Sequence, residues 1–265
     1  MPDLPFDVDH ACPRGMALPE WQARTALATC YRLFDHLGWT EGIYNHITLR
    51  VPHPGARPAF LINPYGLHYA EVTPANLVKV DVDGVVLQDT PHPVNAAGMV
   101  IHCAVHAARH DVQCVMHTHT TAVMAVACKT AGLRGDNFYS AQVAGRLAYH
   151  DFEGITTRSD EAPRLVASLD DRPLMLLRNH GALAAGGSLP EAFSLLWQLQ
   201  RACEVQWAAD AMQGPNQPIA PQVLAEIGSH AAAMRPGGTR PGELLFKGLV
   251  RRAGLTLDRL LDPVC

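Results

Sequence analysis

Val115-Met116-His117-Thr118-His119 is the stretch from which the organisation of this 265-residue chain can be worked out. A short apolar run of this kind predicts a β-strand, whose side chains alternate between the two faces. His117 and His119 therefore project to the same side, where two imidazoles can bind one metal ion. A third imidazole is offered by His180, which directly follows a buried apolar strand. From spacing alone, a packing role for these histidines stays open as the alternative.

The hydrophobic pattern on both sides of this stretch changes between two periods. Helical spacing is expected over residues 18–37, 96–109, 122–130 and 188–212. Strand patterns cover residues 43–51, 59–63, 113–119, 174–177 and 182–185, and a hairpin with an Asp-Gly turn covers 78–87. This order predicts an α/β fold in which a central sheet lies between helical layers.

Three segments are expected along the chain. Residues 1–16 read as an irregular N-terminal arm, and residues 17–214 as the domain that carries the histidines. The Pro-rich linker 215–221 opens a tail, 215–265, with two helical segments within 222–260. We expect this tail to pack on the domain or on a neighbouring subunit.

Composition excludes several classes of function. The net charge of −4 and the scattered Lys and Arg residues provide no footprint for nucleic acid or for an acidic membrane. No apolar run is long enough to span a bilayer, and the first residues lack a secretory pattern. The seven cysteines are odd in number and show no Cys-x-x-Cys spacing, as expected of a reduced, cytoplasmic protein.

Several motifs together carry a resemblance to a known family. They are the run from Val100 to Thr120 around the paired histidines, Leu147-Ala-Tyr-His-Asp-Phe-Glu-Gly, Leu176-Leu-Arg-Asn-His-Gly and, upstream, Tyr44-Asn-His-Ile-Thr-Leu-Arg. Over about residues 20–210 the chain resembles the class II aldolase/adducin family, in its bacterial adducin-like branch. The resemblance implies a single-domain class II aldolase/adducin-like fold with a mainly antiparallel sheet, assembled as a homotetramer. It also implies one divalent metal ion (Zn, Mn, Co or Fe) bound by His117, His119 and His180.

Two departures from the family pattern bear on the substrate. Gly98 stands where the aldolases of the family carry an acid/base Glu, and we expect it to open room above the metal. Ala96 and Ala97 replace two serines that bind phosphate in sugar-phosphate members, and no new Lys or Arg compensates. We therefore expect a small carboxylate substrate without phosphate. Its predicted contacts are Asn63, Gly66, Asn95 and Gly98.

The expected function is a divalent-metal-dependent carbon–carbon lyase acting on a hydroxy or oxo carboxylate. Decarboxylation of a dihydroxyaromatic or ring-cleavage acid is favoured, because loss of CO₂ requires no base for the cleavage itself, only a later proton donor. The predicted donor is His46, with Tyr139 as the second candidate. The alternatives are retro-aldol cleavage of a hydroxy-oxo acid, an iron-dependent oxygenase of the same fold, and a non-catalytic adducin-like interaction module.

Overall fold

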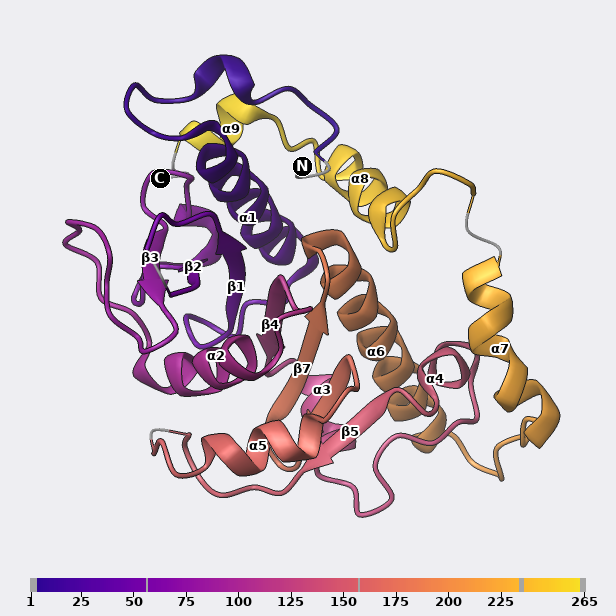
Figure 1. Ribbon diagram of the computed structural model, residues 1–265. Coiled ribbons are helices and arrows are strands. Elements are labelled where there is room, and N and C mark those ends of the chain that lie inside the picture. Colours follow the sequence, from indigo (N-terminus) through magenta and orange to yellow (C-terminus); the bar gives the residue numbers. More distant parts are fainter. Residues whose placement is uncertain (1–3, 56, 157, 234–235, 263–265) are drawn as a thin grey trace.

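The computed structural model describes residues 4–55, 57–156, 158–233 and 236–262. Its centre is a seven-stranded sheet in the order β3-β2-β1-β4-β7-β6-β5 (Figure 1). The strands are β1 (His46–Val51), β2 (Ala59–Ile62), β3 (Val78–Asp81), β4 (Cys114–Thr118), β5 (Leu147–His150), β6 (Leu174–Leu177) and β7 (Gly181–Gly186). Every neighbouring pair is antiparallel except β5 with β6. The α/β class and the mainly antiparallel sheet are confirmed.

One face of the sheet is covered by α1 (Leu18–Leu37), α3 (Thr121–Ala127) and α6 (Leu189–Asp210). Alternate residues of β1 and β4, such as Ile47 and Met116, face these helices and are fully buried in the largest apolar cluster. Tyr31 of α1 ties β1 to the helix, because its hydroxyl accepts from the backbone N–H of Ile47 at 2.9 Å. This face is a closed core.

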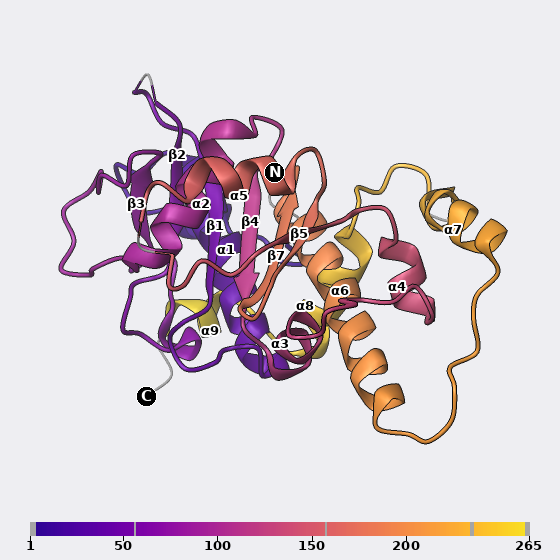
Figure 2. The ribbon, with the colours of Figure 1, turned by 90° about the horizontal axis from the view of Figure 1, so that it is seen from below.

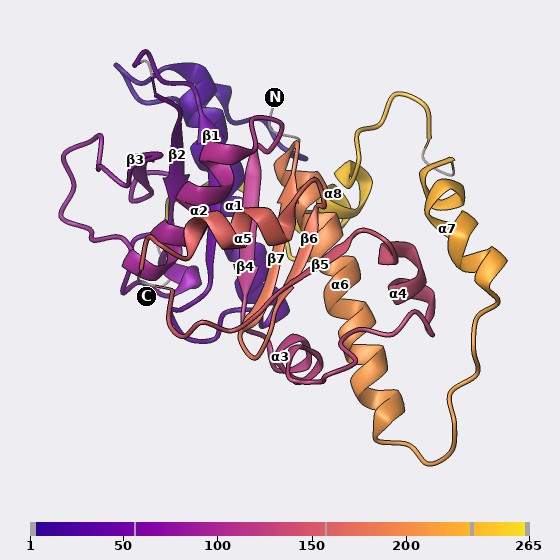
Figure 3. The same cartoon turned by 60° about the horizontal axis from the view of Figure 1, so that its bottom comes forward.

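The opposite face is covered by α2 (Ala96–Ala108) and α5 (Ala162–Leu169), which contact each other (Figure 3). Val115, Ala148 and Met175 point to this side and pack among apolar residues of the two helices. The residues of β1 and β4 that share this face also include His46, Thr48 and His117. The buried polar side chains of β1 and β4 therefore lie between the sheet and α2.

The remaining elements lie at the margins. α4 (Phe138–Val143) packs on α6, and α7 (Pro221–Ala233) contacts α4 and stands away from the sheet (Figure 2). α8 (Glu243–Arg252) lies on α6 and α1, and α9 (Leu257–Leu261) lies on α1. The 3₁₀ turns η1 (Asp9–Ala11) and η2 (Tyr69–Glu71) contact α1. Among the described helices, none combines the length and hydropathy needed to cross a bilayer.

Several local expectations need correction. The sequence pattern did not predict β5, α4 or α5, and the tail holds three helices within its described residues rather than two. The tail packs on its own domain through Phe246, whose ring lies 5.4 Å from that of Phe193. Of the N-terminal arm, residues 1–3 lie outside the described residues. The rest packs on α1, where the Trp21 indole N–H donates to the Val8 carbonyl at 2.7 Å.

Candidate metal centre

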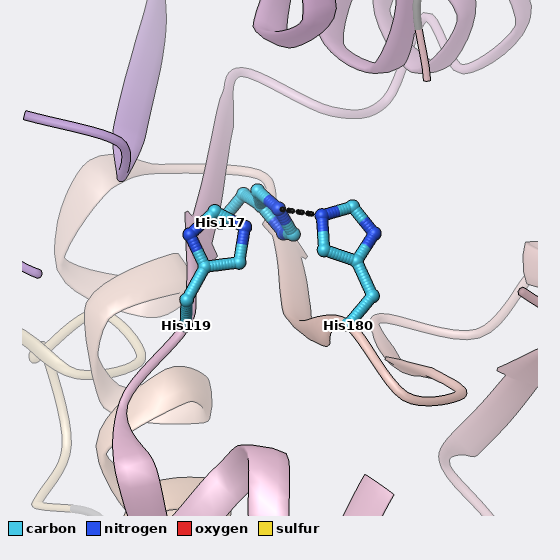
Figure 4. A group of neighbouring side chains, drawn as sticks. All are labelled: His117, His119 and His180. Atoms are coloured by element: carbon cyan, nitrogen blue, oxygen red, sulfur yellow. Dashed lines mark hydrogen bonds between the residues drawn. The ribbon is translucent and has the colours of Figure 1, made fainter. Parts of the chain in front are cut away.

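His117, His119 and His180 converge at one end of the central strands, and each offers a ring nitrogen within 4.8 Å of the others (Figure 4). His117 is the penultimate residue of β4 and is opposite Leu183 of β7. His119 follows the last residue of β4 directly. His180 comes from the turn between β6 and β7, so antiparallel pairing brings the two loops to one edge.

The backbone around this turn explains why these residue types are found there. Asn179 has a φ of +58°, a left-handed conformation that asparagine tolerates better than most residues. At Gly181, a Cβ would lie 2.3 Å from the Thr118 carbonyl oxygen and 3.0 Å from the His119 ring. Only glycine allows β7 to begin this close to His119. From the other side, the buried Asn45 side chain accepts from the His119 backbone N–H at 2.9 Å.

The nitrogen geometry fits a bound cation. The Nε2 atoms of His117 and His180 are 3.3 Å apart, close to the separation of about 3.4 Å expected of two ligands on a tetrahedral zinc. The Nδ1 atom of His117 donates to the Ala182 carbonyl at 2.9 Å, which leaves Nε2 as its free lone pair. His119 Nε2 is buried without a hydrogen-bond partner among the described residues. A divalent ion would satisfy all three atoms.

The three rings are held neutral, as metal ligands must be. Burial lowers the pKa of His117 well below its ordinary value and that of His119 to about 4. Burial is also the main cause of the lowered pKa of His180. Neighbouring imidazoles add to the effect, because a second positive charge in the cluster would be repelled.

His46 lies beside this cluster on β1, directly opposite His117, and their ring centroids are 4.9 Å apart. A Cβ on Gly98 would come within 2.7 Å of its ring. The expected room above the metal at Gly98 is therefore wrong: the His46 imidazole occupies the space that a side chain at position 98 would need. His46 is almost fully buried, and burial lowers its pKa well below the ordinary value.

The other predicted site residues lie elsewhere or serve the backbone. Asn63 is in line with Leu61 on the α1 face of the sheet, and its Oδ1 accepts from the Tyr31 hydroxyl at 2.9 Å. Asn95 is the N-cap of α2, where its side chain accepts from the N–H groups of Ala97 and Gly98. These contacts give both side chains a structural role, and their contact with a substrate stays a prediction.

The structure also gives the surroundings of Gly66 and Tyr139, whose roles at the site stay predictions. Gly66 is exposed in the loop after β2, with a φ of +101° that explains the glycine. Tyr139 lies on α4, and its ring packs edge-on against Trp197 of α6 and against Phe138. Among the described contacts of this chain, none brings Tyr139 to the three histidines.

Sequence reasoning missed a second group of polar residues next to the cluster. Thr48, His102 and His106 are buried and hydrogen-bonded to one another and to His46. The available signal was a pair of spacings. His46 and Thr48 are two residues apart in a strand and share a face, and His102 and His106 are four residues apart in a helix and also share a face.

The comparisons with known proteins agree with one another. The profile of the family described as Class II Aldolase and Adducin N-terminal domain matches residues 25–207. A Pseudomonas aeruginosa protein named "Putative aldolase class 2 protein" is 42% identical over 94% of this chain and 94% of its own. Alpha-adducin of Rattus norvegicus is 40% identical over 83% of this chain, but that match covers only 30% of its own length.

Solved structures give the same result. The crystal structure of an aldolase II superfamily protein from Pseudomonas syringae matches 90% of this chain and 94% of its own, with 41% identity and a TM-score of 0.81. An L-fuculose 1-phosphate aldolase from Glaciozyma antarctica matches 91% and 92% of the two chains, with a TM-score of 0.74 and 24% identity. The second likeness concerns the fold alone.

Proposed function

We propose that this chain, which belongs to the class II aldolase and adducin family, is a divalent-metal-dependent carbon–carbon lyase for a non-phosphorylated hydroxy or oxo carboxylate. The observation that carries the proposal is the convergence of three neutral imidazoles at one end of the sheet. Three neutral ligands leave the charge of the ion uncompensated, so the site favours a chelating anion.

His117, His119 and His180 would hold the ion. When bound, a divalent cation of this kind supplies Lewis-acid stabilisation of the negative charge that develops on a substrate oxygen as a carbon–carbon bond breaks. Zinc and iron suit imidazole ligands well, and manganese and cobalt are the other candidate ions.

The surroundings support a substrate without phosphate. A phosphate dianion needs dense hydrogen-bond donors or positive charge. The first turn of α2 carries Ala96 and Ala97 there, and the Asn95 amide is engaged as the N-cap. The nearby Arg178 is turned away, with its guanidinium 4.2 Å from the Tyr149 ring centroid and one N–H donated to the Lys129 carbonyl.

Within the lyase class, loss of CO₂ from a dihydroxyaromatic or ring-cleavage acid is our finer proposal. No carboxylate stands at position 98 to act as the acid/base group of an aldolase. The His46 ring centroid lies 4.9 Å from that of His117, and His46 is the group that would deliver a proton to the carbanion left by cleavage. Substrate orientation would come from the ion and from the walls formed by β1 and α2.

The similarity to alpha-adducin suggests one alternative function, a non-catalytic interaction module. Such a module has no need for three histidines that converge on one point. The retention of all three in a buried, neutral cluster favours an enzyme.

A matched pair of assays tests the proposal. The purified chain, loaded in turn with zinc, manganese, cobalt and ferrous iron, is offered dihydroxybenzoates and hydroxy-oxo acids while CO₂ and aldehyde release are followed. Ketose 1-phosphates serve as the phosphorylated comparison. CO₂ release that disappears in His180→Ala would support the proposal. Cleavage of a ketose 1-phosphate without any decarboxylation would overturn it, and oxygen consumption with iron would favour an oxygenase.

A further inference from the structure

A continuous hydrogen-bonded chain runs from the edge of the metal centre into the space between β1 and α2. His46 Nδ1 is 2.7 Å from His102 Nε2. The other nitrogen of His102 is 2.6 Å from the Thr48 hydroxyl, which is in turn 2.8 Å from His106 Nε2. The rings of His102 and His106 are completely buried, so the chain ends inside the protein and does not conduct protons to solvent.

The surroundings of His106, at the inner end of the hydrogen-bonded chain, favour one set of proton positions. His106 Nδ1 is buried and makes no hydrogen bond among the described residues. The Val112 backbone raises the pKa of the His106 ring, against the larger, opposing effect of burial. A backbone carbonyl only accepts, so this neighbour favours a proton on Nδ1 of His106 and a bare Nε2. A neutral imidazole has one donor nitrogen and one acceptor nitrogen. The donor–acceptor direction of one hydrogen bond therefore sets that of the next.

Each following bond has only one consistent orientation. The bare Nε2 of His106 accepts from the Thr48 hydroxyl, whose oxygen accepts from Nδ1–H of His102. The bare Nε2 of His102 then accepts from Nδ1–H of His46. His46 is left with an unprotonated Nε2. In the reverse orientation, two lone pairs would face each other in the buried space between His106 and Val112.

The outer end of the chain gives the same answer independently. An atom at the Cβ position of Gly98 would be 2.8 Å from His46 Nε2, so this nitrogen lies against the first turn of α2. The N-terminus of a helix carries a partial positive charge, which favours a lone pair over an N–H group. The neutrality of all three rings is consistent with their burial, which lowers the pKa of His106 to about 3.

We propose that Thr48, His102 and His106 are positioning residues that hold His46 as its Nδ1–H tautomer, with the bare Nε2 in the place of a side chain at position 98. His46 then acts first as an acceptor: it receives a hydrogen bond, and the proton, from a substrate hydroxyl, and it returns that proton to the carbanion carbon after cleavage. The proton balance closes within one turnover, and no outside acid is needed. The catalytic part of this inference rests on the proposed lyase function, whereas the tautomer does not.

The test is ring-nitrogen NMR of the full chain labelled with ¹⁵N-histidine, at pH 7, with and without zinc. Signals of His46, His102 and His106 are assigned from the three single His→Gln variants. The inference expects an N–H type shift at Nδ1 and a bare-nitrogen shift at Nε2 in all three rings. A proton on Nε2 of His46, or a doubly protonated ring, overturns it.

Substitutions at Thr48 test whether the hydrogen-bonded chain determines the tautomer of His46. Thr48→Val removes the bridging hydroxyl and keeps the shape, and it should shift His102 and His46 to a mixture of tautomers. Thr48→Ser keeps the hydroxyl and the wild-type pattern. Thr29→Val, which removes a buried hydroxyl bonded to the Thr25 carbonyl at 2.7 Å, is the matched control and should leave all three rings unchanged.

The outcomes separate this inference from the proposed function. An unchanged His46 spectrum in Thr48→Val overturns the positioning role even if the chain binds metal and releases CO₂. If Thr48→Val does not fold, the wild-type and Thr48→Ser spectra decide. The expected tautomers in a chain that binds no metal would leave the inference standing while the proposed function fails.

Discussion

The two flanks of the histidine cluster differ in the partners of their buried imidazoles. On the flank of β1 and α2, His46 and His102 are hydrogen-bonded to each other, and the hydrogen-bonded chain that they belong to contains no carboxylate. On the flank of β5 and α5, His150 lies 3.4 Å from the buried carboxylate of Glu161 and 3.0 Å from the Ser168 hydroxyl. A ring surrounded by neutral groups has its tautomer determined by hydrogen-bond geometry, whereas the His150 ring has a carboxylate beside it. We therefore assign proton handling to the first flank and structural support to the second.

The largest expected effect is on the cluster that both flanks share. His180→Ala should weaken metal binding by more than about 100-fold, since it removes a ligand itself rather than a group behind one. It should change the free energy of unfolding of the metal-free chain by no more than about 1 kcal/mol, because His180 lies in a partly exposed turn. Metal titration and urea unfolding measure the two quantities. His230→Ala, at an exposed position on α7, is the control. Equal metal affinity in both variants would contradict the account.

The next effect concerns the packing of the first flank. Gly98→Ala should destabilise the fold by about 1–3 kcal/mol, because its Cβ would press on the His46 ring and disturb the bond to His102. His46→Ala in the same chain should remove part of that penalty, so the double-mutant cycle should give a coupling of about 1 kcal/mol or more. Urea unfolding of the four chains measures it. Additive effects would mean that the two residues do not compete for one space.

The first flank should also make the fold sensitive to acid. Burial, reinforced by Arg50, lowers the pKa of His106 to about 3 in the folded state, against about 6.5 when unfolded. The unfolded chain therefore binds an extra proton between these values. Stability from this group is complete above pH 6.5 and falls by up to about 1.4 kcal/mol per pH unit as the pH drops toward 3. Unfolding measured at pH 4.5, 5.5 and 6.5 should show a shallower slope in His106→Gln, and an identical slope would refute the assignment.

The smallest effect is expected on the second flank. Glu161→Gln should change metal affinity by less than tenfold, because Glu161 lies behind His150 and contacts none of the three cluster histidines in the described structure. Glu226→Gln on the exposed side of α7 provides the baseline. A loss as large as that of His180→Ala would show that the second flank supports the metal directly, and the comparison between the flanks would have to be reversed.

The cluster itself was predictable because its geometry is local. Two histidines two apart in a strand must share a face, and the turn that carries His180 ends a clear apolar run. The contact between His46 and Gly98 was not predictable, because these residues lie on β1 and α2 and meet only through tertiary packing. The same holds for Thr48, which lies two residues beyond His46 and could not be matched to His102 and His106 without the register of β1 against α2.

The fold shows the same difference between features that follow from local sequence and features that depend on tertiary packing. The antiparallel core of β1, β2, β4 and β7 follows from strong alternating or apolar runs. β5 (Leu147–His150) pairs in parallel with β6 and has the same length, but its sequence Leu-Ala-Tyr-His lacks the continuous apolar run that indicated β6. The structural contacts of Asn63 and Asn95 were not foreseen for a related reason: an amide at an element boundary can hydrogen-bond the protein as readily as a ligand, and the sequence does not show which it does.

X-ray absorption spectroscopy of the zinc-loaded chain tests the central claim most directly. The account predicts one zinc ion per chain with three imidazole nitrogens at about 2.0–2.1 Å, and any remaining ligand an oxygen. The His119→Ala chain should lose this signal. A zinc environment that contains sulfur, or one with fewer than three imidazoles that is unaltered by His119→Ala, would contradict it.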